Sequence, residues 1–354
     1  MSDGLLKLFP ANQRRFWSYV AEKEEMLQEI RLRLGRPVMV IIRGEEHLLS
    51  QSGQFTDKSA EAYITSKQDL EELLQHICNY SLYAFEDEIR QGFITVSGGH
   101  RVGIAGQVVL GENGQVRNIK HISYMNIRIA HEIKGAADKV LPMVYKNGQL
   151  INTLIISPPG CGKTTLLRDL IRQVSNGNEY GRGMCVGVVD ERSELAGSYL
   201  GVPQNDLGAR SDVLDACPKR LGMLLLLRSM SPGVIAIDEL GTAEELEALK
   251  LALACGTKMI ATIHGESLKD VERKFGVKNI QKEQLFDVFF LLGKRQGRCE
   301  VMEVYWREEA GAEGSRGSID WNGMFGVRAM EKRTALCQSY SIKGSAADTG
   351  AFEK

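Results

Sequence analysis

Apolar and polar residues change their spacing near residue 150, and this change divides the chain into two predicted parts. Before it, apolar residues at helix-like spacing predict a helical segment over residues 1–34, and a continuous apolar run predicts a buried strand at 37–42. Ser66 is placed to cap a further helix. Three strands separated by glycine-containing turns between residues 92 and 130 complete an α+β pattern.

An α+β N-terminal domain is therefore expected over residues 1–135, followed by a linker at 136–150 that carries a connecting helix. After residue 150, short apolar runs alternate with amphipathic helices, which is typical of a parallel sheet with helical crossovers. The pattern predicts strands at 151–156, 184–189, 233–237 and 258–263, and helices at 163–175, 218–230 and 243–255.

The last of these helices begins with a capping box, Thr242 with Glu245. Apolar runs at 285–292 and 301–306 predict two closing strands, so the second domain is expected to cover residues 151–310. Beyond it the apolar periodicity fades into Gly, Ser, Ala and mixed charge, and residues 311–354 are expected to form a disordered tail.

Composition narrows the function classes. The chain has 354 residues, a net charge of −1 and 7% aromatic residues, so neither bulk charge nor stacking side chains favour nucleic acid or an anionic membrane. The scattered cysteines contain no C-x-x-C pair, which indicates reduced thiols. No apolar run approaches the roughly 18–20 residues of a membrane span. A cytoplasmic protein without its own membrane span is expected, and any membrane association would come through a partner.

The segment around residue 160 carries the clearest chemistry. An apolar strand breaks into a Gly/Pro loop, and a helix then begins at Lys163, which is the order of a phosphate-binding P-loop. Ser157 stands where the first glycine of that motif is expected. The predicted nucleotide-binding residues are Ser157, Pro158, Pro159, Gly160, Cys161, Gly162, Lys163, Thr164 and Thr165. The pattern predicts an α/β fold of the P-loop kind (RecA- or AAA+-like), with a parallel sheet flanked by helices and preceded by the α+β N-terminal domain.

Within the loop, Lys163 is expected to reach the β- and γ-phosphates of a nucleoside triphosphate, and the Thr164 hydroxyl to hold Mg²⁺. A second apolar strand ends in Asp238 and Glu239. Asp238 is expected to order the metal, and Glu239 to orient or deprotonate the attacking water. An acidic pair of this kind favours hydrolysis of ATP to ADP and phosphate.

Three further groups are candidates for the catalytic machinery. The strand at 184–189 ends in Asp190 and Glu191, at the sheet edge where ligands bind. Thr262 and His264 end the next predicted strand and are placed to sense the γ-phosphate. Transfer to water also needs positive charge in the transition state. The candidate arginines are Arg101, Arg128, Arg210 and Arg228.

Together these segments resemble the secretion-type ATPases of type II and type IV systems. The residues that carry the likeness are Ser157–Thr164, Asp190–Arg192, Leu227–Leu240 and Ala261–His264. Gly98–Gly106 and Asn126–Ala130 extend it to the stage III sporulation protein AA family of endospore-forming bacteria. Two positions depart from the secretion motors: Ser157 in the P-loop, and Asp238-Glu239 where Gly-Glu is common, a pair more like that of AAA+ ATPases.

The resemblance implies an ATP- and Mg²⁺-dependent hexameric motor, a homo-oligomer on the mother-cell side of a secretion-like complex between mother cell and forespore. Its partner would be a membrane protein of that complex, which would hold it at the membrane periphery. It also implies that N-terminal arginines reach the nucleotide, which favours Arg101 and Arg128. Two other classes stay open at this point: a nucleotide-gated binding module, for example for single-stranded nucleic acid, and a small-molecule kinase.

Overall fold

The chain folds into two compact units, one of which takes in a segment from later in the sequence. A computed structural model describes residues 3–276, 280–295, 298–307, 316–320 and 324–325. The first unit contains Met1–Ile133 together with Ala196–Asp206, and the second contains Lys134–Leu195 and Leu207–Lys354. Each unit has its own hydrophobic core.

The N-terminal unit is built on a seven-stranded antiparallel sheet in the order β4-β3-β2-β1-β7-β6-β5. Its strands are β1 (Leu27–Arg33), β2 (Met39–Ile42), β3 (Glu45–Leu49), β4 (Phe55–Thr56), β5 (Phe93–Thr95), β6 (Arg101–Leu110) and β7 (Val116–Arg128). Its α-helices are α1 (Asp3–Leu6), α2 (Arg14–Ala21), α3 (Lys67–Ile77) and α4 (Glu86–Gln91). The Ser66 cap is confirmed, since its side chain and that of Asp69 form a capping box at the start of α3.

One expectation for this unit is wrong. Residues 27–33 form strand β1 rather than the end of a helix, and β1 pairs with β2 on one side and β7 on the other. Leu27, Ile30 and Leu32 are buried in the core. Their spacing fits a helix about as well as a strand interrupted by a bulge, and here the bulge between Leu27 and Glu29 accounts for the irregular interval.

Residues 196–206 belong to the N-terminal unit, although the spacing along the chain places them in the second domain. Three hydrogen bonds hold them there. The Gly98 amide donates to Gln204 Oε1 at 2.9 Å, Asn79 Nδ2 donates to the Tyr199 hydroxyl at 2.6 Å, and the Asp206 amide donates to a Glu132 carboxylate oxygen at 2.9 Å. The chain thus leaves the second unit after Leu195 and returns to it at Leu207.

The second unit contains a nine-stranded sheet in the order β12-β11-β13-β14-β10-β15-β16-β17-β18. The strands are β10 (Thr153–Ser157), β11 (Val186–Asp190), β12 (Ser211–Asp215), β13 (Val234–Ile237), β14 (Lys258–His264), β15 (Val288–Arg295), β16 (Arg298–Trp306), β17 (Arg316–Asp320) and β18 (Met324–Phe325). From β12 to β15 the pairs are parallel, and beyond β15 they are antiparallel. The α/β fold with a parallel sheet and a β-rich N-terminal unit is confirmed.

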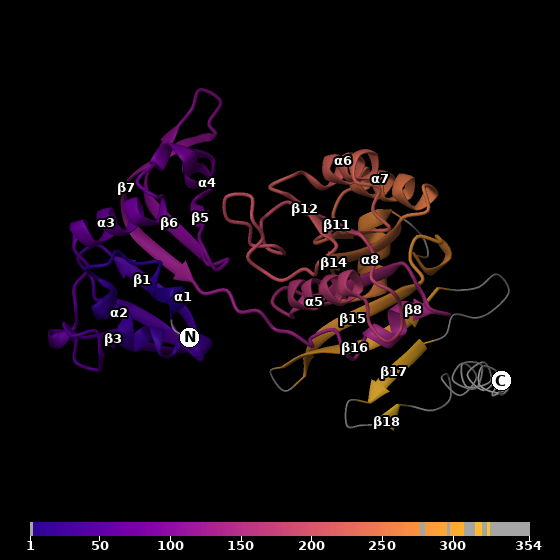
Figure 1. The fold of residues 1–354 in the computed structure, drawn as a ribbon, viewed down its shortest axis with the longest axis horizontal. Helices are drawn as coiled ribbons and strands as arrows, with labels where there is room; N and C mark the ends of the chain where they lie inside the picture. The colour runs from indigo at the N-terminus through magenta and orange to yellow at the C-terminus, as the bar shows by residue number, and fades with distance from the viewer. Residues whose placement is uncertain (1–2, 277–279, 296–297, 308–315, 321–323, 326–354) are drawn as a thin grey trace, which may run out of the picture. The chain divides into compact units, whose positions relative to one another are not determined.

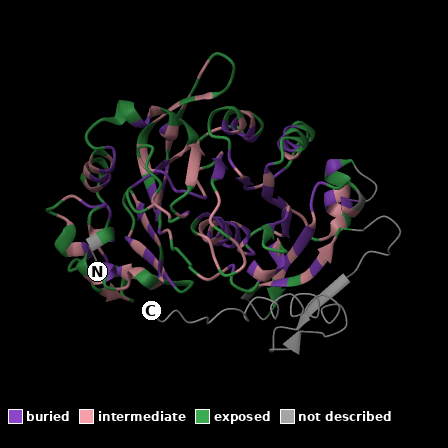
Figure 2. Cartoon of the chain, turned by 45° about the vertical axis from the view of Figure 1, so that its right-hand side comes forward, coloured by how far each residue is buried: buried purple, intermediate pink, exposed green. Residues whose placement is uncertain are grey.

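Four helices cover this sheet: α5 (Lys163–Asn176), α6 (Lys219–Ser229), α7 (Ala243–Ala254) and α8 (Leu268–Phe275). Apolar residues of α6, α7 and α8 join one core cluster with alternate residues of the strands, whereas those of α5 lie outside that cluster, on the other sheet face (Figure 1). Because both faces are covered, the central strands are buried along their whole length (Figure 2).

Three details differ from the sequence pattern. The linker holds only a 3₁₀ turn (Leu141–Val144) and a short hairpin of β8 (Tyr145–Lys146) and β9 (Gln149–Leu150), where a longer helix is expected. Strand β12 and helix α8 have no counterpart in the expected elements. The expected disordered tail lies mostly outside the described residues, and its described part forms β17 and β18, since β17 pairs with the edge of β16.

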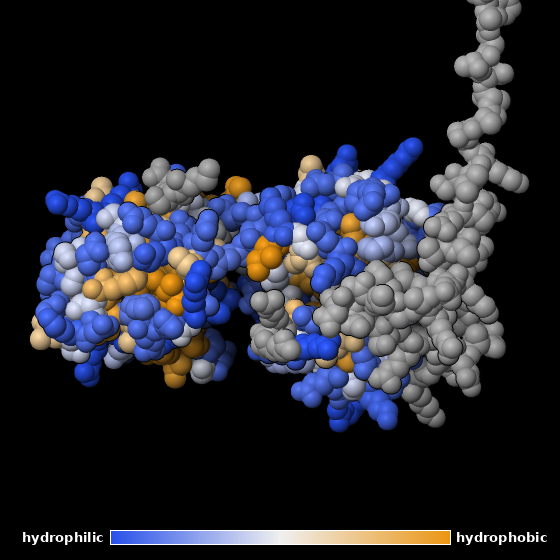
Figure 3. Space-filling view, turned by 90° about the horizontal axis from the view of Figure 1, so that it is seen from below, coloured by the Kyte–Doolittle hydropathy of each residue, from blue (hydrophilic) through white to orange (hydrophobic). Residues whose placement is uncertain are grey.

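The surface shown in Figure 3 is mainly hydrophilic, with hydrophobic residues gathered in limited areas. Within the described part of the chain, no helix combines the length and apolar character needed to cross a bilayer.

Candidate nucleotide site at the carboxyl ends of the parallel strands

The P-loop connects the end of β10 to the start of α5. Gly160 and Gly162 have φ angles of 67° and 77°, a region that residues with a Cβ rarely adopt. Ser157 is the last residue of β10 and fully buried, and its hydroxyl donates to the Pro158 carbonyl at 2.7 Å. The Ser157 hydroxyl is therefore satisfied by the backbone of the next residue.

The loop rests on the hairpin that closes the sheet. Cys161 is buried, and the Cys299 thiol on β16 donates to the Gly160 carbonyl at 3.5 Å. A Cβ added at Gly162 would lie 3.5 Å from Cys299 Cβ. The side of the loop that faces away from the helix is thus occupied by β16. The backbone N–H groups of the P-loop and the N-terminus of α5 are the groups that could bind an anion.

Lys163 and Thr164 reach the acidic residues that follow β13. Lys163 Nζ lies 2.6 Å from Glu239 Oε1 and 3.4 Å from Asp238 Oδ1. The Thr164 hydroxyl donates to Asp238 Oδ2 at 2.7 Å. These residues are more than 70 positions apart, and they meet because β14 alone separates β10 from β13 in the sheet.

Thr262 and His264 complete this group from the end of β14. The buried Thr262 hydroxyl donates to Asp238 and accepts the backbone N–H of Glu239 at 2.8 Å. His264 Nε2 lies 2.7 Å from Glu239 Oε1, beside Lys163. Thr262 therefore fixes both acidic residues, while His264 contacts the carboxylate expected to act on water.

Glu239 has an unusual backbone and a perturbed acidity. Its φ angle is 60°, a left-handed conformation that costs free energy for a residue with a Cβ. Burial opposes ionisation of its carboxyl, but the hydrogen bond and charge of Lys163, together with the charges of His264 and Arg192, outweigh burial and lower its pKa. An ionised carboxylate in a strained, defined position suits a group that accepts a proton or orients water.

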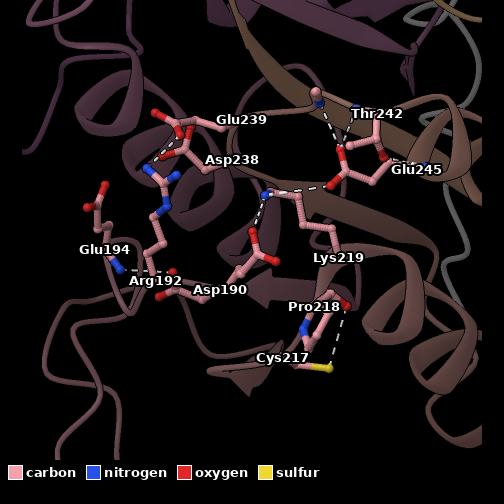
Figure 4. Close-up of polar contacts among 12 residues, drawn as sticks. Asp190, Arg192, Glu194, Cys217, Pro218, Lys219, Asp238, Glu239, Thr242 and Glu245 are labelled. Carbon is pink, nitrogen blue, oxygen red and sulfur yellow. Dashed lines mark hydrogen bonds and ion pairs between the residues drawn. The ribbon is translucent and has the colours of Figure 1, made fainter. Parts of the chain in front are cut away.

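The segment after β11, Asp190–Arg192, forms an acidic box whose residues have two different roles. Both Asp190 oxygens accept backbone N–H groups, from Glu194 and Leu195 at 2.9 Å each. Glu191 instead pairs with Lys219. Arg192 Nη1 lies 3.0 Å from Glu239 Oε2 (Figure 4). Asp190 therefore shapes the turn after β11, while Arg192 contacts Glu239 and Glu191 contacts Lys219. One cavity is lined by Asp190, Glu191, Arg192, Glu194, Lys219, Asp238 and Glu239.

The candidate arginines fall in different places. Arg101 and Arg128 are direct partners across β6 and β7 in the N-terminal unit, and the Arg101 guanidinium carbon lies 3.5 Å from the centre of the Phe93 ring. Arg210 donates to the Ser175 carbonyl at 3.0 Å, at the end of α5. Arg228 is exposed on α6. Arg210 thus has a structural role that the sequence does not reveal.

Two residues of the site were missed by sequence reasoning: Arg192 and Lys219. Arg192 follows two acids directly after a buried strand, and this placement could have indicated a site residue. Lys219 begins α6, and nothing in the local pattern distinguishes it from a surface lysine. Its burial is visible only in the fold, where its side chain is 9% exposed.

The residues around Thr164 fit a magnesium ion. The Thr164 hydroxyl and the Asp238 carboxylate are hard oxygen donors within hydrogen-bonding distance of one another, at the mouth of an anion-binding loop. Mg²⁺ favours such oxygens together with water and phosphate.

The parallel sheet, with the P-loop after β10 and the acidic residues after β13, has the fold seen in solved structures of secretion and pilus ATPases. The ATPase DotB of Legionella pneumophila matches with a TM-score of 0.54 and 16% identity, over 85% of this chain and 82% of that chain. The pilus retraction motor PilT with bound ADP also gives 0.54, with 15% identity over 92% of this chain and 88% of that chain. At such identities the likeness is one of fold.

The chain itself belongs to the family described as sporulation stage III, protein AA, whose model matches residues 2–312. It is 40% identical over 302 residues to stage III sporulation protein AA of Bacillus subtilis (strain 168). That match covers 85% of this chain and 94% of the relative. The family expected from the motifs is confirmed.

Proposed function

We propose that this chain is a motor ATPase that binds ATP with Mg²⁺ and hydrolyses it to ADP and phosphate. The observation that carries the proposal is the convergence of Lys163, Asp238 and Glu239 beside the P-loop, with Nζ–oxygen distances of 2.6 and 3.4 Å. The lysine pairs with the carboxylate that would act on water. The structural neighbours DotB and PilT are an ATPase and a pilus motor, which supports this reading.

The side chains divide the work in this proposal. Lys163 would contact the β- and γ-phosphates, and Glu239 would orient a water molecule. Thr164 and Asp238 would hold Mg²⁺, and the bound ion would supply positive charge to the phosphate oxygens. Thr262 fixes the positions of the Asp238 side chain and the Glu239 backbone. His264 and Arg192 each contact one oxygen of the Glu239 carboxylate. Asp190 would hold the turn after β11 through its two backbone contacts, and Glu191 lines the same cavity as Asp238 and Glu239.

Positive charge for the transition state would come from another copy of the chain. Arg101 and Arg128 lie directly opposite one another on adjacent strands, so both project from one face of the N-terminal sheet. This arrangement supports their use against a phosphate in a ring-shaped homo-oligomer, for which a hexamer is the form implied by the resemblance.

The family supports a cellular setting. The relative from Bacillus subtilis is named as a sporulation protein, and we place the proposed motor on the mother-cell side of a secretion-like complex with the forespore. A membrane protein of that complex would be its partner.

The proposal is tested by ATP turnover of the purified protein against two variants. Lys163→Ala should lose nucleotide binding, because the cation that contacts two phosphates is gone. Glu239→Gln should bind ATP normally and lose turnover by roughly 100-fold or more, because an amide cannot accept the proton of water. Light scattering in ATP and Mg²⁺ reports the size of the assembly in the same samples.

The matched control is Glu244→Gln, an exposed acid on α7 that should leave both quantities unchanged. Equal loss of binding in the Lys163 and Glu239 variants would contradict the separate roles. Tight binding without turnover by the wild-type protein would contradict the ATPase proposal and favour a nucleotide-gated binding module.

A further inference from the structure

Lys219 is a buried cation in a position that helix electrostatics disfavour. It is the first residue of α6, where the positive end of the helix dipole repels an ammonium group. Its side chain is only 9% exposed. A buried ammonium is stable only when anions surround it. Nearby carboxylates must therefore stabilise the charge of Lys219.

Those partners come from the turn after β11 and from the first turn of α7. Lys219 Nζ pairs with a Glu191 carboxylate oxygen, and it lies 3.8 Å from Glu245 Oε1 (Figure 4). Glu191 belongs to the turn after β11, and Glu245 to the first turn of α7. One ammonium group thus connects the turn that carries Arg192 with the helix that begins just after Glu239.

Glu245 also fixes the backbone that follows the acids of β13. Its other oxygen accepts the Gly241 amide at 2.7 Å and the Thr242 amide at 3.2 Å. Glu239 lies two residues before Gly241, in its strained left-handed conformation. Displacement of Glu245 would therefore loosen the segment that holds the Glu239 backbone.

The base of α6 is itself held tightly against β11. A Cβ added at Gly222 would lie 2.5 Å from Val189 Cγ1, and one added at Gly187 would lie 2.9 Å from Leu226 Cδ1. Such close packing leaves α6 little freedom to slide along the strand. The backbone of Lys219 is therefore fixed in position. In the pair with Glu191, the Glu191 side chain is the more exposed, at 35%.

We propose that Lys219 is a positioning residue for ATP hydrolysis, which holds the Glu191 carboxylate toward the cavity it shares with Asp238 and Glu239. The inference rests on the proposed ATPase function and adds a second carboxylate to its water-handling group. Lys219 acts through Glu191 and does not contact phosphate. Its loss should therefore change the rate of the reaction and leave nucleotide affinity intact.

The test compares Lys219→Met with the wild-type protein in steady-state hydrolysis and in binding of a non-hydrolysable ATP analogue. Removal of a residue that orients a catalytic group should lower kcat roughly 10- to 100-fold. The KM for ATP and the Kd for the analogue should stay within about twofold, because ground-state contacts are unchanged. Lys219→Arg, which keeps the charge, should restore part of kcat.

A double variant separates this role from general damage to the fold. If Lys219 acts through Glu191, Lys219→Met combined with Glu191→Gln should turn over no more slowly than the slower single variant, within about twofold. Lys250→Met is the matched control, since Lys250 is an exposed lysine on α7 that pairs with Glu247 at 2.8 Å. It should behave as the wild-type protein does.

Several outcomes would overturn the inference. Multiplicative losses in the double variant, weaker analogue binding by Lys219→Met, or full activity of Lys219→Met would each exclude a positioning role. If Lys219→Met does not fold by circular dichroism, Glu191→Gln and Lys219→Arg decide, and normal kcat in both contradicts the inference. Inactive wild-type protein would instead end the proposed function, and the inference with it.

Discussion

A single buried hydroxyl, that of Thr262, connects the two acidic residues that follow β13. It donates to the Asp238 carboxylate and accepts the Glu239 backbone N–H. Because Thr262 is fully buried, no water can replace either bond. The place of this threonine at a strand end suggested a phosphate sensor, and its contacts indicate that it also sets the geometry of the acids.

Thr262→Val removes the hydroxyl and keeps the shape of the side chain. The Glu239 amide and one Asp238 oxygen then lose a buried partner, so we expect a loss of about 1–3 kcal/mol in the free energy of unfolding. Turnover should fall as well, because Asp238 and Glu239 are no longer held. Urea denaturation and ATP hydrolysis measure the two effects.

Thr257→Val serves as the control for this experiment. Thr257 is also buried and its hydroxyl donates to the Pro232 carbonyl at 3.2 Å, away from the acidic residues. It should lose stability without a specific loss of turnover. Equal turnover in the two variants would contradict the role given to Thr262.

At the scale of secondary structure, the contact between α6 and β11 determines where the cation and the acidic box meet. Gly222 faces Val189, and the glycine allows the helix to approach the strand closely. In an isolated helix, glycine is less favourable than alanine by about 1 kcal/mol. Its use at this position is therefore explained by packing and not by helix propensity.

A glycine-to-alanine substitution within a helix usually raises stability, but Gly222→Ala should lower it. The new Cβ would lie 2.5 Å from Val189 Cγ1, in a core that cannot give way, so we expect a loss of about 1–3 kcal/mol in the free energy of unfolding. Urea denaturation measures it. Arg220→Ala, on an exposed position of the same helix, should show no loss. A more stable Gly222→Ala protein would contradict the close packing.

At the scale of the whole molecule, the two units have separate cores and should differ in how acid affects their stability. His100 lies in the N-terminal unit, and its Nδ1 accepts the Ala130 amide at 3.0 Å. Burial, with a smaller contribution from the charge of His131, lowers the pKa of His100 to about 4. The native state therefore keeps this histidine neutral at pH values where the unfolded chain binds a proton.

Acid should thus destabilise one unit selectively. Stability from neutral His100 is complete above its unfolded pKa of about 6.5 and is lost as the pH falls toward 4, by about 2 kcal/mol at pH 5. Calorimetry should resolve two unfolding transitions, and the one that Gly222→Ala in the second unit does not lower belongs to the N-terminal unit. That transition should shift down at pH 5, and less so in His100→Gln. An equal shift in both proteins would contradict the assignment.

The sequence by itself determined the features that depend on neighbouring residues. The P-loop, the strand that ends in Asp238 and Glu239, the Ser66 cap of α3 and the capping box of α7 are readable because their chemistry needs particular residues within a few positions. The alternation of strands and helices after residue 150 indicated the parallel sheet for the same reason, since each element has its own apolar period.

Only the tertiary structure decided the features that depend on distant partners. Strand β1 became a strand because β2 and β7 provide its hydrogen bonds, although its apolar spacing also fitted a helix. Residues 196–206 joined the N-terminal unit through single hydrogen bonds that leave no pattern in the chain. Lys219 and Arg192 gained their roles from carboxylates on other elements. Pairings of this kind arise from long-range packing, which local propensity does not encode.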